Sequence, residues 1–137
     1  MKQIIIHFFF TLLVNVVSAQ TLDTLNYLRS FEQQKAQYIG QPFSVLLNAM
    51  VQVQPKTVRG GRNFKNKNQI PFCTFYFINP DNVSSNGVVY MIIDWQTPIP
   101  LQDINYYTNK NHYHFTSEEL QFYGGKIIKD ISIFVHR

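Results

Sequence analysis

Two apolar runs on either side of a polar turn are the feature that most constrains the fold. The first run extends from Ile70 to Ile78 and is apolar on both faces. The second extends from Val88 to Trp95 and has the same character, and the polar residues 81–87 turn the chain between them. Short apolar runs bounded by turn residues indicate buried strands. We therefore expect a β-hairpin in the middle of a sheet.

The spacing of apolar residues before this hairpin is helical. Between Thr21 and Tyr38, leucine or phenylalanine recurs at every third position, which is typical of an amphipathic helix. Gly40 suits the end of this helix because glycine readily adopts the left-handed conformation. Pro42 suits the first turn of a second helix over residues 43–50, where a missing N–H costs nothing. Two N-terminal helices are therefore predicted.

Two further segments have weaker patterns. Valine alternates with glutamine over residues 51–54, which predicts a short strand that the following Pro55 confines to a sheet edge. Residues 104–115 are rich in tyrosine and asparagine and are too polar for a buried element. We expect at most a short exposed strand there.

The C-terminal part of the chain predicts one more helix and one more strand. Thr116 and Glu119 have the spacing of a capping box, which predicts the start of a short helix that ends at Gly124. Apolar residues alternate with polar ones near the end of the segment 126–135, as in a strand. The predicted fold class is α+β: two N-terminal helices packed on a mostly antiparallel sheet of about four strands, with a short helix before the last strand.

The first nineteen residues have the features of a signal peptide. Lys2 provides a positive start, residues 4–17 form an apolar run with three polar interruptions, and small residues precede Gln20. A membrane anchor is the alternative, but a spanning helix needs about 20 apolar residues. We therefore expect cleavage after Ala19. Residues 20–137 would then form a single α+β domain without a transmembrane segment, exported to the periplasm or secreted.

The single cysteine, Cys73, limits how this domain is stabilised. One thiol cannot form an intrachain disulfide, so an exported domain must depend on its apolar core. Removing 19 of the 137 residues leaves 118, and a domain of that size buries roughly 65% of its unfolded surface. Cys73 itself lies within an apolar strand, which favours buried packing over a role as a nucleophile.

A basic segment follows the predicted edge strand. No acidic residue occurs between Lys35 and Asp81, while five cations and one aromatic residue fall close together: Lys56, Arg59, Arg62, Phe64, Lys65 and Lys67. Such a patch attracts anionic partners. Because an exported chain rarely meets nucleic acid, we expect a protein or a cell-envelope component as the partner and no nucleic acid. The alternative is a hairpin tip that its charge keeps soluble.

Tyrosines and asparagines form the second distinctive surface. The tyrosines are Tyr106, Tyr107 and Tyr113, and asparagines lie between them. Tyrosine provides a large contact area at low entropic cost and asparagine provides adaptable hydrogen bonds, a combination used in recognition surfaces. In the alternative interpretation these tyrosines only cover the end of a small core.

An enzymatic function has weaker support. The sequence contains no glycine-rich phosphate loop, no nucleophile elbow and no zinc-protease motif. His112 and His114 would point to the same side of a strand, which suits a metal site, but two ligands are not sufficient. No cofactor is predicted.

Two hypotheses remain from these patterns. The first is an exported recognition module, such as an inhibitor, an immunity-type protein or an accessory protein, that binds through its basic loop and its Tyr/Asn-rich segment. The second is a small hydrolase or metal-dependent enzyme centred on His112, His114 and a carboxylate.

Overall fold

The computed structural model describes residues 23–137, and the predicted signal peptide lies outside them. Four helices and four strands make up the fold. They are α1 (Thr24–Gln33), α2 (Phe43–Ala49), β1 (Thr57–Gly60), β2 (Gln69–Tyr76), β3 (Val89–Pro100), α3 (Leu101–Asn111), α4 (Ser117–Gly124) and β4 (Ile128–Val135), with short 3₁₀ turns at Lys35–Gln37 and Pro80–Asn82. No helix among residues 23–137 is long and apolar enough to span a membrane.

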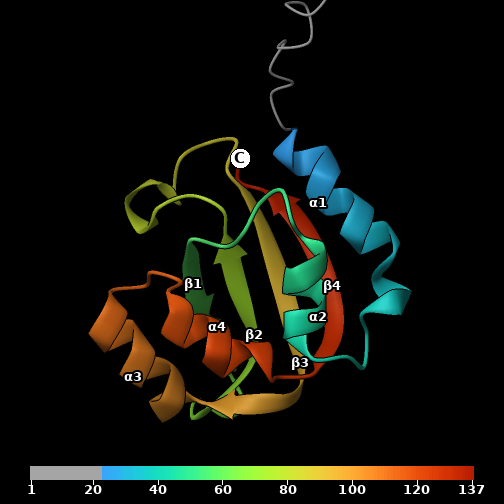
Figure 1. Ribbon diagram of the computed structural model, residues 1–137. Coiled ribbons are helices and arrows are strands. Elements are labelled where there is room, and N and C mark those ends of the chain that lie inside the picture. The colour runs from blue at the N-terminus through green and yellow to red at the C-terminus, as the bar shows by residue number, and fades with distance from the viewer. Residues whose placement is uncertain (1–22) are drawn as a thin grey trace, which may run out of the picture.

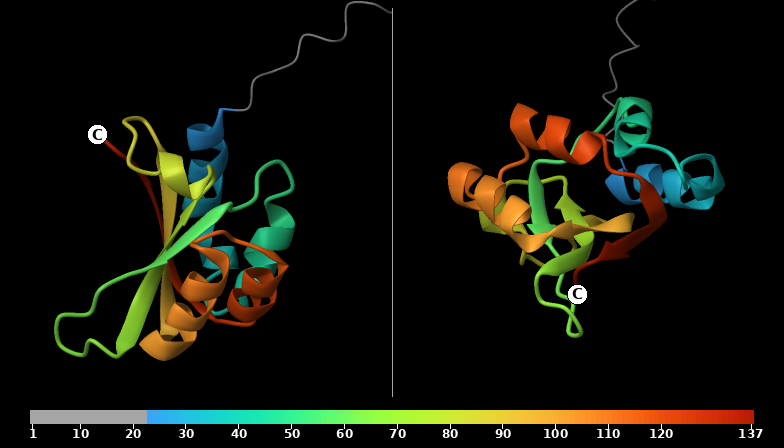
Figure 2. Two further views of the ribbon diagram at one scale, coloured as in Figure 1. Left: turned by 90° about the vertical axis from the view of Figure 1, so that its left-hand side faces the viewer. Right: turned by 90° about the horizontal axis from the view of Figure 1, so that it is seen from below.

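The four strands form one antiparallel sheet in the order β1-β2-β3-β4. The helices gather on one face of this sheet and leave the other face uncovered (Figure 1 and Figure 2). The predicted α+β fold is therefore confirmed, including the central hairpin of β2 and β3 and the short helix before the last strand. Two helices also precede the sheet, as expected.

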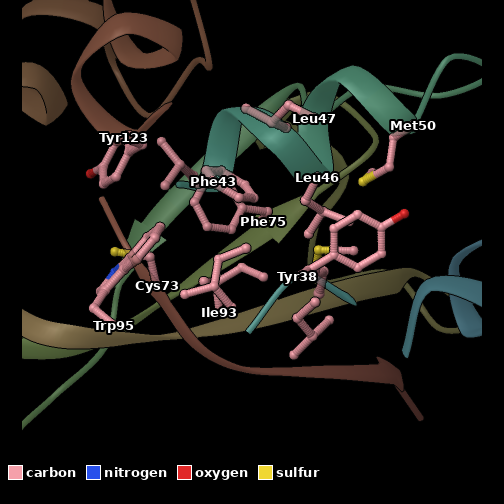
Figure 3. Packing of buried hydrophobic residues seen from close by; sticks show 14 of the residues in the cluster. Tyr38, Phe43, Leu46, Leu47, Met50, Cys73, Phe75, Ile93, Trp95 and Tyr123 are labelled. Carbon is pink, nitrogen blue, oxygen red and sulfur yellow. The ribbon is translucent and has the colours of Figure 1, made fainter. Parts of the chain in front are cut away.

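The core lies between the sheet and the helices. Its centre is Phe75 on β2, which is fully buried and contacts aromatic rings from α2, β3, α4 and the segment before α4. Phe43 of α2 is the nearest, with 4.7 Å between ring centroids. Figure 3 shows Phe43, Phe75, Trp95 and Tyr123 of this cluster, together with Leu46 and Ile93. Edge-to-face packing of this kind adds stability beyond the burial of apolar area.

Cys73 belongs to this core, as predicted. Its side chain is fully buried, and it lies close to Trp95 and Tyr123 (Figure 3). Burial raises the pKa of the Cys73 thiol to about 12. Because the thiolate is the reactive form, Cys73 has a packing role in the folded protein.

The expectation of a strand within residues 104–115 is wrong, because residues 101–111 form helix α3. Leu101, Ile104 and Thr108 recur at helical spacing, and Ile104 is buried against the sheet while the polar residues face outward. His112 then ends the helix in the left-handed conformation, with a φ of 52°.

Two other strand boundaries differ from the prediction. Residues 51–55 are not a strand, and β1 begins two residues after Pro55. Strand β3 continues past Pro98 to Pro100 instead of ending at Trp95. The pairing of β3 with β2 shifts by several residues between Asp94 and Ile99. Pro98 lies in this irregular part, where its missing backbone N–H does not interrupt a regular row of hydrogen bonds.

Both edges of the sheet are partly covered. At the β4 edge, the backbone N–H of Ile133 donates to the Glu32 carboxylate of α1 at 2.6 Å, and residues 126–128 bond to residues 40–43. At the β1 edge, Val58 N–H donates to Tyr113 O and Phe115 N–H donates to Lys56 O. Residues 113–115 thus cover the first half of β1 and leave its second half open.

Candidate functional site

The basic loop and helix α3 lie together at one end of the sheet. Residues 61–68 connect β1 to β2, and Figure 2 (left) shows this loop in green, extending from the sheet at the end where α3 lies in orange. The backbone N–H of Leu101, the first residue of α3, donates to Asn68 O at 2.9 Å. The end of the loop is thereby fixed to the start of the helix.

A groove separates the loop and β1 from α3, and we call it the β1–α3 groove. Its largest hollow, about 540 Å³, lies between Gly60–Phe64, Lys67 and an apolar floor of Ile70 and Leu101. A second hollow of about 230 Å³ continues between Gly60 and α3 and ends at Arg59 and Tyr113. A third hollow of about 530 Å³ is lined by Leu101, Gln69 and their neighbours. Leu101 borders all three hollows, so they adjoin one another.

Two glycines form the β1 wall of this groove. A Cβ atom on Gly61 would lie 2.4 Å from the ring of Phe72, which is too close for any side chain. A Cβ atom on Gly60 would lie 3.3 Å from Ile104 of α3 and would narrow the groove. A double glycine is typical of a turn, but Gly60 is the last residue of β1 and Gly61 continues the pairing, with its N–H donating to Phe72 O.

Arg59 and Tyr113 close one end of the groove. The guanidinium carbon of Arg59 lies 5.1 Å from the ring centroid of Tyr113, within the range of a cation–π contact. Tyr113 is held in place because Val58 N–H donates to its carbonyl oxygen at 3.0 Å. Nε of Arg59 is buried and has no hydrogen-bond partner within residues 23–137. The structure thus joins one residue from each of the two surfaces predicted from the sequence.

The positive charge of the basic segment is not neutralised within the described part of the chain. The ion pairs found there are Lys35–Asp130 and Lys110–Glu118, at 2.8 and 2.7 Å. Neither involves a cation of the basic segment. Arg62, Lys65 and Lys67 are exposed, and the Phe64 side chain is 91% exposed. The rim of the groove therefore presents cations and one aromatic ring to solvent.

Some of the predicted binding residues lie elsewhere. Tyr106 is 57% exposed on α3 and carries Lys110 over its ring, and Tyr107 packs against Phe122 of α4 with 4.6 Å between ring centroids. Neither tyrosine borders the three hollows. Lys56 and Lys65 are exposed and also lie outside their linings. Tyr107 is half-buried where α3 meets α4.

The two histidines do not form the arrangement that the enzyme hypothesis requires. His112 and His114 are exposed and follow the end of α3, so the side-by-side geometry of a strand does not apply to them. Within residues 23–137, no three His, Cys, Asp or Glu side chains lie close enough together to hold a metal ion.

The carboxylates also have structural partners. Glu119 is 1% exposed and accepts hydrogen bonds from the Thr116 backbone, the Thr116 hydroxyl and the Asn111 amide, so the predicted capping box is confirmed. Glu118 pairs with Lys110. Asp94 lies on the uncovered face of the sheet opposite Asp130, and burial, followed by the charge of Asp130, raises the pKa of Asp94.

The uncovered face of the sheet is a second exposed surface. Tyr76, Tyr90 and Phe134 form a row across β2, β3 and β4, with ring centroids 5.5 and 5.7 Å apart. These distances match the spacing of neighbouring strands, and the rings pack on one another as cross-strand pairs do. The charge of Arg59 reaches Tyr76 in this row, but none of the hollows described above lies on it, so the β1–α3 groove is the stronger candidate site.

Sequence reasoning missed the α3 side of the groove. Leu101, Ile104 and Thr108 share one helical face, and their spacing was the signal from which this helix could have been predicted.

Comparison of the chain with protein-family models, with curated proteins and with solved structures finds no match. The function is therefore argued from the groove itself.

Proposed function

We propose that this chain is an exported recognition module that binds an acidic protein or cell-envelope component through the β1–α3 groove. One observation carries the proposal: two segments far apart in the sequence enclose an apolar floor beneath a rim of cations that have no carboxylate partner within residues 23–137. Clefts with an apolar lining and a few convergent polar groups are the usual form of a binding site.

The floor and the rim contribute differently to binding. Ile70 is already buried and only shapes the floor, whereas Leu101 is half-buried and the ring of Phe64 is exposed. Full burial of an exposed side chain such as Phe64 is worth about 1.5–3 kcal/mol. The rim cations are exposed, so water and salt screen them, and they contribute more to the association rate and to partner choice than to affinity. We therefore expect Phe64 to contribute most of the binding affinity, as an anchor residue, and the cations to determine the preference for an acidic partner.

The export part of the proposal rests on residues 1–19. Their apolar run is shorter than a membrane span and is followed by small residues before Gln20. Mass spectrometry of the protein from its native cell tests this part. A mature N-terminus at Gln20 supports export, and full-length chain in the cytosol contradicts it.

Capture of partners from envelope extract tests the binding part. The test variant carries Arg62→Ser, Lys65→Ser and Lys67→Ser in the loop. The matched control carries Arg29→Ser, Lys129→Ser and Arg137→Ser, which removes the same charge from exposed positions away from the groove. We expect the loop variant to lose the proteins that the unmodified chain captures and the control to retain them. Equal capture by both variants would overturn the role of the basic loop.

A second variant separates the floor from the rim. Phe64→Ser removes the most exposed ring of the loop and leaves its charge unchanged. If Phe64 is the anchor, this variant should dissociate faster from a captured partner at any salt concentration. The triple loop variant should instead lose the salt dependence of association.

A further inference from the structure

The open half of β1 exposes unpaired backbone groups to the β1–α3 groove. Val58 N–H points away from β2, toward Tyr113 O, and Gly61 N–H points to β2, toward Phe72 O. Because backbone groups alternate sides along a strand, the N–H and C=O of Gly60 point away from β2. Neither group has a hydrogen-bond partner on that side within residues 23–137. An exposed strand edge of this kind can pair with another chain.

Residues 113–115 already pair with the neighbouring part of this edge. They run antiparallel to β1 and bond to Lys56 and Val58, and the helix α3 ends just before them. Beyond Val58, no strand within residues 23–137 lies next to β1 on the side away from β2. The 230 Å³ hollow lies at this position. An extended segment in this position would continue the strand that residues 113–115 begin.

The two sides of this position differ in chemistry. A Cβ atom on Gly60 would point at Ile104, so the helix side of the edge is apolar at Ile104 and Leu101, with Asn105 and Thr108 of α3 beside them. Arg59 alternates with Gly60 and lies on the opposite side, where it contacts the ring of Tyr113. Side chains of a bound strand would alternate in the same way. Apolar side chains would then face α3, and acidic side chains would face Arg59.

We propose that the groove binds an extended peptide segment of a partner protein, in which acidic and apolar residues alternate, and that this segment pairs with Gly60 as an added strand. The proposal rests on the proposed function and names its partner class. The charge of the rim favours such a segment over a neutral or basic one. The glycines leave the edge without side chains that would block it.

Amide hydrogen exchange of Gly60 tests the strand pairing directly. The probe is a capped synthetic peptide in which Asp and Val alternate, added to ¹⁵N-labelled protein. We expect the exchange of the Gly60 amide to slow by at least about tenfold at saturation, because hydrogen-bonded amides exchange only on opening. Gly61 is the internal control, because its amide is already bonded to Phe72 O and should change little.

Modified peptides test the pattern and the backbone contact separately. A peptide with the same composition but all Asp residues before all Val residues should bind at least about tenfold more weakly. Such a peptide cannot direct Val side chains toward α3 and Asp side chains toward Arg59 along its whole length. Of two peptides N-methylated at every Val or at every Asp, one should lose binding and the other should retain it, since only one set of amides faces β1. Equal binding by the two methylated peptides would overturn the strand pairing.

The outcomes separate this inference from the proposed function. If the alternating peptide binds but the Gly60 amide still exchanges rapidly, the groove binds acidic chains and the added strand is refuted. If an anionic polysaccharide displaces the peptide and does not protect Gly60, the partner is a polyanion and the peptide proposal is refuted. If the peptide does not bind while the loop variant still loses its envelope partner, only this inference fails. If both tests are negative, the proposed function fails as well.

Discussion

Replacing Glu119 by glutamine tests the contact that holds α3 and α4 together beside the groove. The Glu119 carboxylate is almost completely buried and accepts from Thr116 N at 2.8 Å, from the Thr116 hydroxyl, and from Asn111 Nδ2 at 2.7 Å. All of these groups act as donors. A glutamine amide offers one oxygen and one NH₂ group, so either one donor faces another donor or the Asn111 amide turns over and gives up its contact with the Thr116 hydroxyl.

The expected loss of stability follows from this count. Leaving one buried donor without an acceptor costs about 1–3 kcal/mol. Part of this cost is offset because a neutral amide is cheaper to bury than a carboxylate. We therefore expect Glu119→Gln to lower the free energy of unfolding by about 1–2 kcal/mol. Urea denaturation followed by far-ultraviolet circular dichroism measures this change.

The neighbouring residue provides a matched control. Glu118→Gln removes the same charge from the same turn of α4, but its partner is the exposed Lys110. Exposed ion pairs contribute little, so we expect no resolvable change in the urea midpoint for this variant. If Glu119→Gln and Glu118→Gln unfold at the same urea concentration with equal slopes, the buried carboxylate does not stabilise the junction of α3 and α4.

Three further predictions concern single residues. His112 has a left-handed φ of 52°, which glycine adopts more easily than histidine. His112→Gly should therefore raise the free energy of unfolding, measured by urea denaturation, by about 0.5–1 kcal/mol. A decrease would mean that the histidine side chain makes stabilising contacts. Burial and the charge of Asp130 raise the pKa of Asp94, so its ionised form opposes folding; Asp94→Asn should stabilise the protein at pH 7. This gain should shrink as the pH falls through the raised pKa of Asp94 and vanish below about pH 3, where the carboxyl is protonated in both states; a gain that does not depend on pH would contradict the assignment. Burial raises the pKa of the Cys73 thiol to about 12, so a thiol reagent at pH 8 should label it in denaturant and not in the folded protein, as mass spectrometry would show.

Most of the fold could be predicted from the sequence because its elements have regular apolar patterns. The runs 70–78 and 88–95 predicted the central strands, and the spacing of Thr116 and Glu119 predicted the start of α4. Helix α3 was missed because Ile104 is its only buried residue, so no clear stripe of apolar side chains marks its inner face. The extension of β3 to Pro100 was missed because it depends on a shift in the pairing of β3 with β2, and the sequence of one strand alone does not show such a shift.

The candidate site was predicted in part. The loop cations and Phe64 were identified because charge patterning is visible in the sequence itself. The contact of Arg59 with Tyr113 was not, because it depends on the pairing of β1 with residues 113–115, which are far away along the chain. The position of Gly60 at the end of a strand was missed for a similar reason. A double glycine usually indicates a turn, and only the sheet register shows that Gly60 ends a strand.

The two edges of the sheet show why the open half of β1 favours one kind of partner. At β4, the carboxylate of Glu32 accepts from the backbone N–H of Ile133, which would otherwise be free to donate to another strand. At Gly60 no such group within residues 23–137 covers the edge, and cations of the adjoining loop lie beside it. Cations at a free edge oppose pairing between two copies of the same basic chain, since each copy brings the same charge. The same cations attract an acidic strand. The open edge is therefore protected against self-association by the charge that selects its proposed ligand.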